Sequence, residues 1–286
     1  MDNKIKQISS VLDTVILNLH SASESEDGVY GISTSLRTLD KLTSGWQNSE
    51  LILIAGYEKM GLDKLLISMA LKMLSDNETP IAFFSMKYSC EQLVQRLLMN
   101  LTGIKRDKLL SAKLTEDEWK KVDEAKTKLY SVPLYICDAP NPTLAEISEQ
   151  AHKLTDVEGI EVLLIDDITR IKVNEGESVT ESLKILAREL DIPVVACLEL
   201  KDRTDSESRF YGKRPEHSDF PDMESIFQYS DLLCFLHRPE YFHITEDKDG
   251  NSTLGMAELI LKTENSFEPE IITLRYEMDF CRFWEE

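Results

Sequence analysis

The chain has 286 residues, of which 42% are hydrophobic and 29% charged, an ordinary composition for a globular domain of this length. Its formal net charge of −20 repels a phosphate backbone, so a nucleic-acid site would have to be a local basic patch. Five scattered cysteines, no signal-peptide pattern and no long apolar run predict a cytoplasmic protein with reduced thiols and no membrane contact.

The N-terminal stretch 3–20 carries apolar residues at the spacing of one helical face: Ile5, Ile8, Leu12, Val15, Ile16 and Leu19. The polar, acidic stretch 21–27 predicts a linker, which divides the chain into a helix and linker at 1–28 and a main domain at 29–286. An isolated amphipathic helix leaves its apolar stripe in water, so this helix is expected to dock. It would either brace its own domain or bind a neighbouring chain.

In the main domain, apolar runs typical of buried parallel strands alternate with helical patterns. The expected strands are 51–55, 80–84, 132–137, 162–165 and 192–198, and the expected helices are 62–74, 90–101, 115–129, one opening at 143, and 179–190. Three more strands, at 231–236, 256–262 and 270–276, make the end strand-rich. This pattern predicts an α/β fold with a doubly wound, mostly parallel sheet, whose ligands bind at the carboxyl ends of the strands.

The segment from Gly56 to Gly61 follows the first expected strand, precedes a helix and has the two-glycine spacing of a phosphate-binding P-loop. Two glycines at this distance are common in proteins. An ordinary strand-to-helix turn therefore explains the segment equally well when it is taken alone.

Further blocks resemble, in order and with few gaps, the C-terminal motor domain of the DnaB-type replicative helicases. They are Gly31–Thr34 with Leu39–Trp46, Phe83–Ser89 with Glu91–Arg96, Pro133–Ile136 with Asp138, Leu163–Asp166, and Arg214-Pro215 with Ser218-Asp219, Ser225-Ile226, Gln228 and Asp231. The helix at 3–20 is placed like the linker helix of that family. The resemblance implies a RecA-like fold and, in a working member, ATP and magnesium as cofactors.

The positions that carry the chemistry of that family are changed here. The resemblance places Leu62 and Asp63 where a working P-loop has its lysine and its magnesium-binding serine or threonine. Lys64 comes one residue late, about 100° around a helix, and is expected to point elsewhere. The positions of the catalytic glutamate, the γ-phosphate-sensing glutamine and the arginine finger hold Lys87, Glu199 and Asn265.

Only Asp166, at the position of the Walker B aspartate, keeps the residue type of the family. It could ligate magnesium, or it could be a strand-end carboxylate retained for structure. Four cationic residues, Arg203, Arg209, Lys213 and Arg214, fall in the loop that in the family faces the central channel and contacts single-stranded DNA. Acidic neighbours offset their charge, so a solvated loop is an equally good interpretation.

Together these substitutions predict a vestigial P-loop (Gly56, Gly61, Leu62 and Asp63) that uses no cofactor. The expected function is that of a pseudo-ATPase: a noncatalytic interaction or scaffold protein linked to DNA replication, which self-associates or binds a replication protein through the helix at 3–20. The alternatives are an ATP-dependent replicative helicase and a DNA-binding ring protein without motor activity.

Three carboxylates, Asp63, Asp166 and Glu199, are expected at one sheet edge from which the P-loop lysine is missing. Such an arrangement is costly in a partly buried cleft. The new positive charge at the same edge is Lys87. It is therefore expected to fold into the cleft and to lie within about 6 Å of one of these carboxylates.

Overall fold

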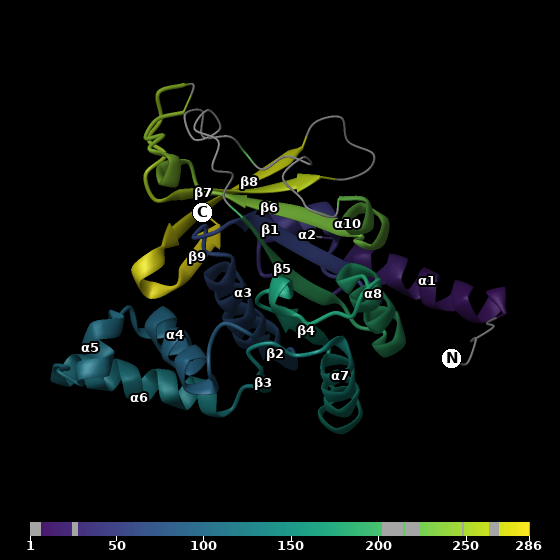
Figure 1. The fold of residues 1–286 in the computed structure, drawn as a ribbon, viewed down its shortest axis with the longest axis horizontal. Helices are drawn as coiled ribbons and strands as arrows, with labels where there is room; N and C mark the ends of the chain where they lie inside the picture. Colours follow the sequence, from purple (N-terminus) through teal and green to yellow (C-terminus); the bar gives the residue numbers. More distant parts are fainter. Residues whose placement is uncertain are drawn as a thin grey trace.

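A mixed sheet of nine strands runs through the part of the chain that this computed structural model describes, residues 7–24, 28–201, 214, 223–247, 249–262 and 269–285 (Figure 1). The strand order is β3-β2-β4-β5-β1-β6-β7-β8-β9. Strands that follow one another in sequence are mostly not neighbours in the first part of the sheet. The chain therefore returns through helices that cover the sheet faces.

Six strands form the parallel part of the sheet. They are β3 (Leu134–Asp138), β2 (Ile81–Ser85), β4 (Val162–Ile165), β5 (Val194–Leu200), β1 (Leu51–Tyr57) and β6 (Leu232–His237). All residues of β1, β2 and β4 are buried, as the continuous apolar runs predicted for strands covered on both faces. The predicted doubly wound α/β fold is confirmed.

Two groups of helices pack around the parallel strands. The first contains α3 (Leu62–Asn77), α4 (Cys90–Thr102), α5 (Arg106–Ser111) and α6 (Glu116–Tyr130), and the second contains α7 (Leu144–Glu158), α8 (Val179–Leu190) and α10 (Met223–Tyr229). The short α2 (Arg37–Thr43) precedes β1. Thr115 and Thr143 cap α6 and α7 through capping boxes with Glu118 and Glu146, and each pair satisfies backbone amides that the first helical turn leaves free.

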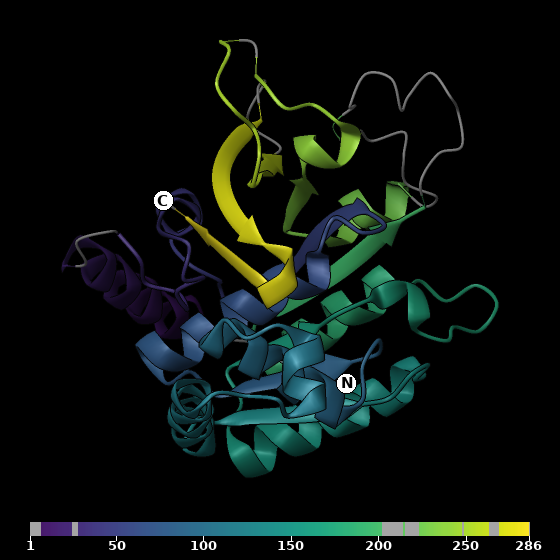
Figure 2. The ribbon, with the colours of Figure 1, turned by 90° about the vertical axis from the view of Figure 1, so that its left-hand side faces the viewer.

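The C-terminal strands β7 (Met256–Lys262), β8 (Glu270–Glu277) and β9 (Arg282–Glu285) extend the sheet in antiparallel fashion. Figure 2 shows β8 and β9, in yellow, with β9 beside the blue helix α3. The Ser68 hydroxyl of α3 donates to the Cys281 carbonyl at 3.0 Å and accepts from the Phe283 amide at 2.9 Å, which fixes β9 against α3. The end of the chain therefore lies close to the helix that follows the P-loop.

The N-terminal helix α1 (Ile8–Glu24) projects sideways from the main body in Figure 1. It continues through residues 21–24, so the prediction that the linker starts at residue 21 is wrong; Ile5 lies outside the described residues. Its apolar residues Ile8, Leu12, Val15, Ile16 and Leu19 are between 43% and 81% exposed. The described helices include none that is both long enough and apolar enough to cross a bilayer.

Candidate functional site

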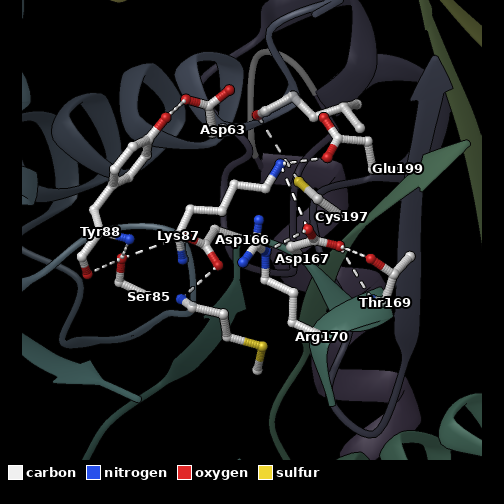
Figure 3. Close-up of polar contacts among 12 residues, drawn as sticks. Asp63, Ser85, Lys87, Tyr88, Asp166, Asp167, Thr169, Arg170, Cys197 and Glu199 are labelled. Atoms are coloured by element: carbon white, nitrogen blue, oxygen red, sulfur yellow. Dashed lines mark hydrogen bonds and ion pairs between the residues drawn. The ribbon is translucent and has the colours of Figure 1, made fainter. Parts of the chain in front are cut away.

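The carboxyl ends of four neighbouring strands bring the expected site residues to one edge of the sheet (Figure 3). Asp63 begins the helix after β1, Lys87 follows β2, Asp166 follows β4, and Glu199 lies on β5. The pairing of Gly56 on β1 with Glu199 on β5 sets the register at this edge. The structure thus gathers in one place residues that are up to 136 positions apart in the sequence.

Backbone amides of the P-loop segment donate hydrogen bonds to carbonyl groups of the same chain. β1 continues past Gly56, and Tyr57 pairs with Leu200 of β5. The Glu58 amide donates to the Leu200 carbonyl at 3.1 Å, and the Met60 amide donates to the Tyr57 carbonyl at 3.2 Å. A P-loop binds phosphate through amides that converge on the anion. At least these two amides are engaged within the chain instead.

Leu62, which the resemblance aligns with the P-loop lysine, is buried. A Cβ atom built on Gly56 would lie 3.4 Å from the Leu62 side chain and 3.0 Å from the Leu236 carbonyl. The isobutyl group therefore packs over the first glycine of the loop. It has no charge to offer a phosphate.

Asp63, which the resemblance aligns with the magnesium-binding hydroxyl, is a buried carboxylate. It accepts a hydrogen bond from the Tyr88 hydroxyl at 2.7 Å and pairs with the Lys64 ammonium at 3.3 Å. Burial opposes its ionisation, but Lys64, Tyr88 and then Lys87 together hold its pKa below the ordinary value. Lys64, expected to point elsewhere, thus turns its ammonium to the neighbouring carboxylate.

Lys87 reaches into the site from the end of β2 (Figure 3). Its ammonium lies 3.1 Å from Glu199 Oε2 and 3.7 Å from Asp167 Oδ2, and its side chain is only 11% exposed. Burial lowers the pKa of Lys87, but Asp167 and Glu199 outweigh burial and raise it above its usual value. Of the three acids expected as partners, Asp63, Asp166 and Glu199, the ammonium thus contacts Glu199, and its other contact is Asp167.

Asp166 is fully buried, and its carboxylate accepts three hydrogen bonds from residues 85–87. It accepts hydrogen bonds from the amides of Met86 at 2.7 Å and Lys87 at 3.2 Å, and from the Ser85 hydroxyl at 3.2 Å. Burial raises the pKa of Asp166 to about 6 against the effect of these bonds. This geometry is that of a carboxylate fixing the 85–87 turn. Among the described residues, no group of histidine, cysteine and carboxylate side chains is arranged to hold a metal ion.

Asp167, which the sequence analysis did not single out, is the most highly connected acid of the site. It accepts from the Thr169 amide at 3.1 Å, the Thr169 hydroxyl at 2.7 Å and the Arg170 Nε at 3.1 Å. Its side chain is buried beneath Lys87. The Asp166-Asp167 pair at the end of an apolar strand was the available signal, since either residue could have faced the cleft.

The predicted DNA-facing loop is described at one of its four cations. Arg214 donates through Nε and Nη2 to the two oxygens of Glu258 on β7, both at 2.7 Å. Its guanidinium is therefore neutralised by a carboxylate of the same chain. Arg203, Arg209 and Lys213 lie outside the described residues, as does Asn265 at the arginine-finger position.

Arg238, which sequence reasoning missed, is a cation that contacts the P-loop backbone. Arg238, just after β6, donates to the Lys59 carbonyl at 3.0 Å and to the Tyr276 hydroxyl at 3.0 Å. The Tyr276 hydroxyl in turn donates to Glu240 Oε2 at 2.6 Å. The loop backbone is therefore tied to β6 and β8. No local sequence pattern marks these contacts.

Comparison with known proteins gives one family. The family model described as DnaB-like helicase C terminal domain matches residues 31–285. The replicative DNA helicase DnaB of Geobacillus stearothermophilus is 29% identical over 97% of this chain and 62% of its own length. A probable replicative DNA helicase of Trieres chinensis is 31% identical over 100% of this chain and 65% of its own length. The chain thus spans less than two thirds of the length of these relatives.

Solved structures show the same fold. A structure described as an ATPase domain superposes with a TM-score of 0.85 at 21% identity, covering 99% of this chain and 100% of that domain. A DnaB-like replicative helicase, described with its interactions with primase, gives a TM-score of 0.80 at 21% identity and covers 99% of this chain and 68% of that one. At this identity the likeness establishes the RecA-like fold.

Proposed function

The chain belongs to the family of DnaB-like helicase C-terminal domains, and from this membership we propose that it is a noncatalytic member: a cytoplasmic pseudo-ATPase that acts as an interaction or scaffold protein in DNA replication. Its relatives are named replicative DNA helicases. We thus propose a role in DNA replication, as for these relatives, but without ATP-driven motor activity.

The replacement of both phosphate-site ligands carries the proposal. Leu62 puts an apolar side chain where a lysine would reach the β- and γ-phosphates, and Asp63 puts a buried carboxylate where magnesium would be held. A negative charge at that place repels phosphate, and the repulsion is strong in a partly buried cleft. Catalysis of phosphoryl transfer rests on positioning and charge stabilisation, so losing these groups removes its basis.

The exposed stripe of α1 supports a role through protein contacts. A monomer gains nothing from leaving seven large apolar side chains of one helix in water, whereas burying them in an interface is worth about 25 cal/mol per Å² of apolar surface. The main domain offers a groove of about 990 Å³ between α3, α6 and β9, lined in part by Leu71, Leu129 and Phe283. We place the α1 helix of a second copy in this groove.

ATP hydrolysis measured with and without single-stranded DNA tests the proposal. The DnaB helicase of Geobacillus stearothermophilus serves as the active control. We expect no turnover by this chain and, in a titration with a fluorescent ATP analogue, weak binding at most. Turnover at a rate comparable to the control, abolished in Asp166→Ala, contradicts the proposal.

Binding of labelled single-stranded DNA separates the scaffold from a DNA-binding ring. Glu258 engages two of the five N–H donors of Arg214 and offsets its charge, which weakens its attraction for phosphate. We expect fluorescence anisotropy to show no binding at 50 mM salt. Affinity that falls steeply with salt would instead support the ring protein without motor activity.

A further inference from the structure

The site gathers more carboxylates at one sheet edge than a folded domain can leave without cations. Four carboxylates, Asp63, Asp166, Asp167 and Glu199, lie at one sheet edge (Figure 3). Three of them are buried, and Glu199 is 27% exposed. Burying a carboxylate without a partner costs several kcal/mol of folding free energy. A folded domain of ordinary stability therefore needs a compensating cation for such a group.

Two cations serve the flanks of this group. Lys64 pairs with Asp63, and Arg170 pairs with Asp167 from the side away from the P-loop. Glu199 has one ion-pair partner among the described residues, and that partner is Lys87. Lys87 is also the one cation within 4 Å of carboxylates from two different strand ends, Asp167 after β4 and Glu199 on β5, in the described part of the chain.

The backbone of Lys87 is fixed as firmly as its ammonium. Its amide donates to Asp166 Oδ2, and the preceding amide of Met86 donates to Asp166 Oδ1. The side chain therefore starts from a defined point and crosses the cleft to the opposite acids. This is the behaviour of a side chain held by its surroundings, in contrast to a solvated lysine on a helix surface.

We propose that Lys87 is the resident counter-ion of this site, holding Asp167 and Glu199 together in one fixed arrangement that needs no bound metal ion or nucleotide. The inference rests on the proposed function, because a working site would need the same space for its ligands. It assigns Lys87 a positioning role: the lysine replaces a bound cation in the charge balance and performs no chemistry.

Thermal unfolding of matched lysine variants is the first test. Lys87→Met removes the ammonium and keeps the stem, whereas Lys120→Met removes an ammonium that is paired with Asp117 at 3.6 Å but is 73% exposed. Breaking a buried pair on one side is strongly destabilising, so we expect the melting temperature of Lys87→Met to fall by about 4 °C or more. Lys120→Met should change it by about 1 °C or less. Equal shifts would overturn the proposal.

A magnesium titration is the second test, with a readout that a merely structural lysine would not move. Lys87→Glu presents an additional carboxylate, and clustered carboxylate oxygens bind divalent cations. We expect MgCl₂ to raise the melting temperature of Lys87→Glu by several degrees over NaCl at equal ionic strength, and to leave the wild type unchanged. A response of the same size in the wild type, or none in the variant, refutes the counter-ion role. Lys87→Gln is the substitute if Lys87→Glu does not fold.

The two proposals fail in different ways. ATP turnover by the wild type would defeat the proposed function, whatever the lysine variants do. Absence of turnover, together with a Lys87→Met variant as stable as the wild type, would defeat the counter-ion role alone.

Discussion

Arg238 ties the loop between β1 and α3 to the rest of the sheet, and Arg238→Ala tests how much this tie contributes to stability. The guanidinium donates to the Lys59 carbonyl at 3.0 Å and to the Tyr276 hydroxyl at 3.0 Å, and it stacks 4.1 Å from the centre of the Tyr276 ring. Lys59 has a φ of 68°, in the left-handed region that non-glycine residues rarely adopt. The arginine therefore helps to hold Lys59 in this unfavourable conformation.

The expected magnitude follows from these contacts. A hydrogen bond with a charged partner contributes about 1.5–3 kcal/mol, and a cation–π contact at a partly exposed site adds about 0.5–1 kcal/mol. Arg238 is half-buried, so the lower ends apply, and its Nε is buried with no hydrogen-bond partner in the described part of the chain, which subtracts from the gain. We expect Arg238→Ala to lower the free energy of unfolding by about 2 kcal/mol.

Urea denaturation followed by tryptophan fluorescence measures this loss. Arg106→Ala, on the exposed surface of α5, is the control and should stay within about 0.5 kcal/mol of the wild type. Arg238→Lys keeps the charge but loses the planar fork, so it should fall between the wild type and Arg238→Ala. If Arg238→Ala is as stable as the Arg106→Ala control, the loop does not depend on this tie and the reasoning is refuted.

Three further outcomes are expected. Leu12→Asp in α1 should reduce the oligomer mass measured by light scattering, and a wild type that is already monomeric would speak against docking between copies. Gly61→Ala should destabilise the chain more than Gly159→Ala, although both glycines have a positive φ. A Cβ at Gly61 would lie 2.6 Å from Met278 Cε, whereas a Cβ at Gly159 would face open space. Equal losses of unfolding free energy in the two variants would contradict this packing argument. Burial lowers the pKa of His237 to about 4, so the unfolded state binds protons first as the pH falls below about 6.5, and the contribution of this residue to stability falls by about 2 kcal/mol between pH 7.5 and pH 5. Urea titrations at both pH values should show a smaller pH dependence in His237→Phe, and an unchanged dependence would exclude His237 as the cause.

The helices and strands could be predicted because the apolar pattern of each element lies within its own short stretch of sequence. The strand at 162–165 and the helix at 179–190 have the predicted bounds in β4 and α8, since a short apolar run and an amphipathic period with a capping residue each suffice to define an element. The short α2 and α5, with 7 and 6 residues, offer too few turns for such a period. The four-residue β9 is likewise defined by its pairing with β8 and not by its own pattern.

The partners at the site depended on geometry that the sequence does not contain. Lys87 and Glu199 could be expected to meet, because parallel strands end at the same edge of the sheet, and only β4 separates β2 from β5. The choice between Asp166 and Asp167 depends on which way the chain turns after β4, and Asp167 has φ −166° and ψ 100°, still extended, so the two side chains diverge. Tyr88 was visible in a motif, but its bond to Asp63 spans 25 residues and depends on how α3 and α4 pack.

The substitutions at this edge make sense only as a set. With glutamate at position 87, as the resemblance implies for a working site, Glu199 would lose its ion-pair partner and five carboxylates would face the cations of Lys64 and Arg170. With lysine at position 62, an ammonium would have to displace the leucine packed over Gly56, beside a loop whose amides of Glu58 and Met60 are already bonded within the chain. Each change away from the family is thus matched by a contact elsewhere in the site: Asp63 by Tyr88, and Glu199 by Lys87. A site drifting without constraint would accumulate unpaired buried charges, which cost several kcal/mol each. The pairing observed instead compensates the buried carboxylates of this edge with donors of the same chain.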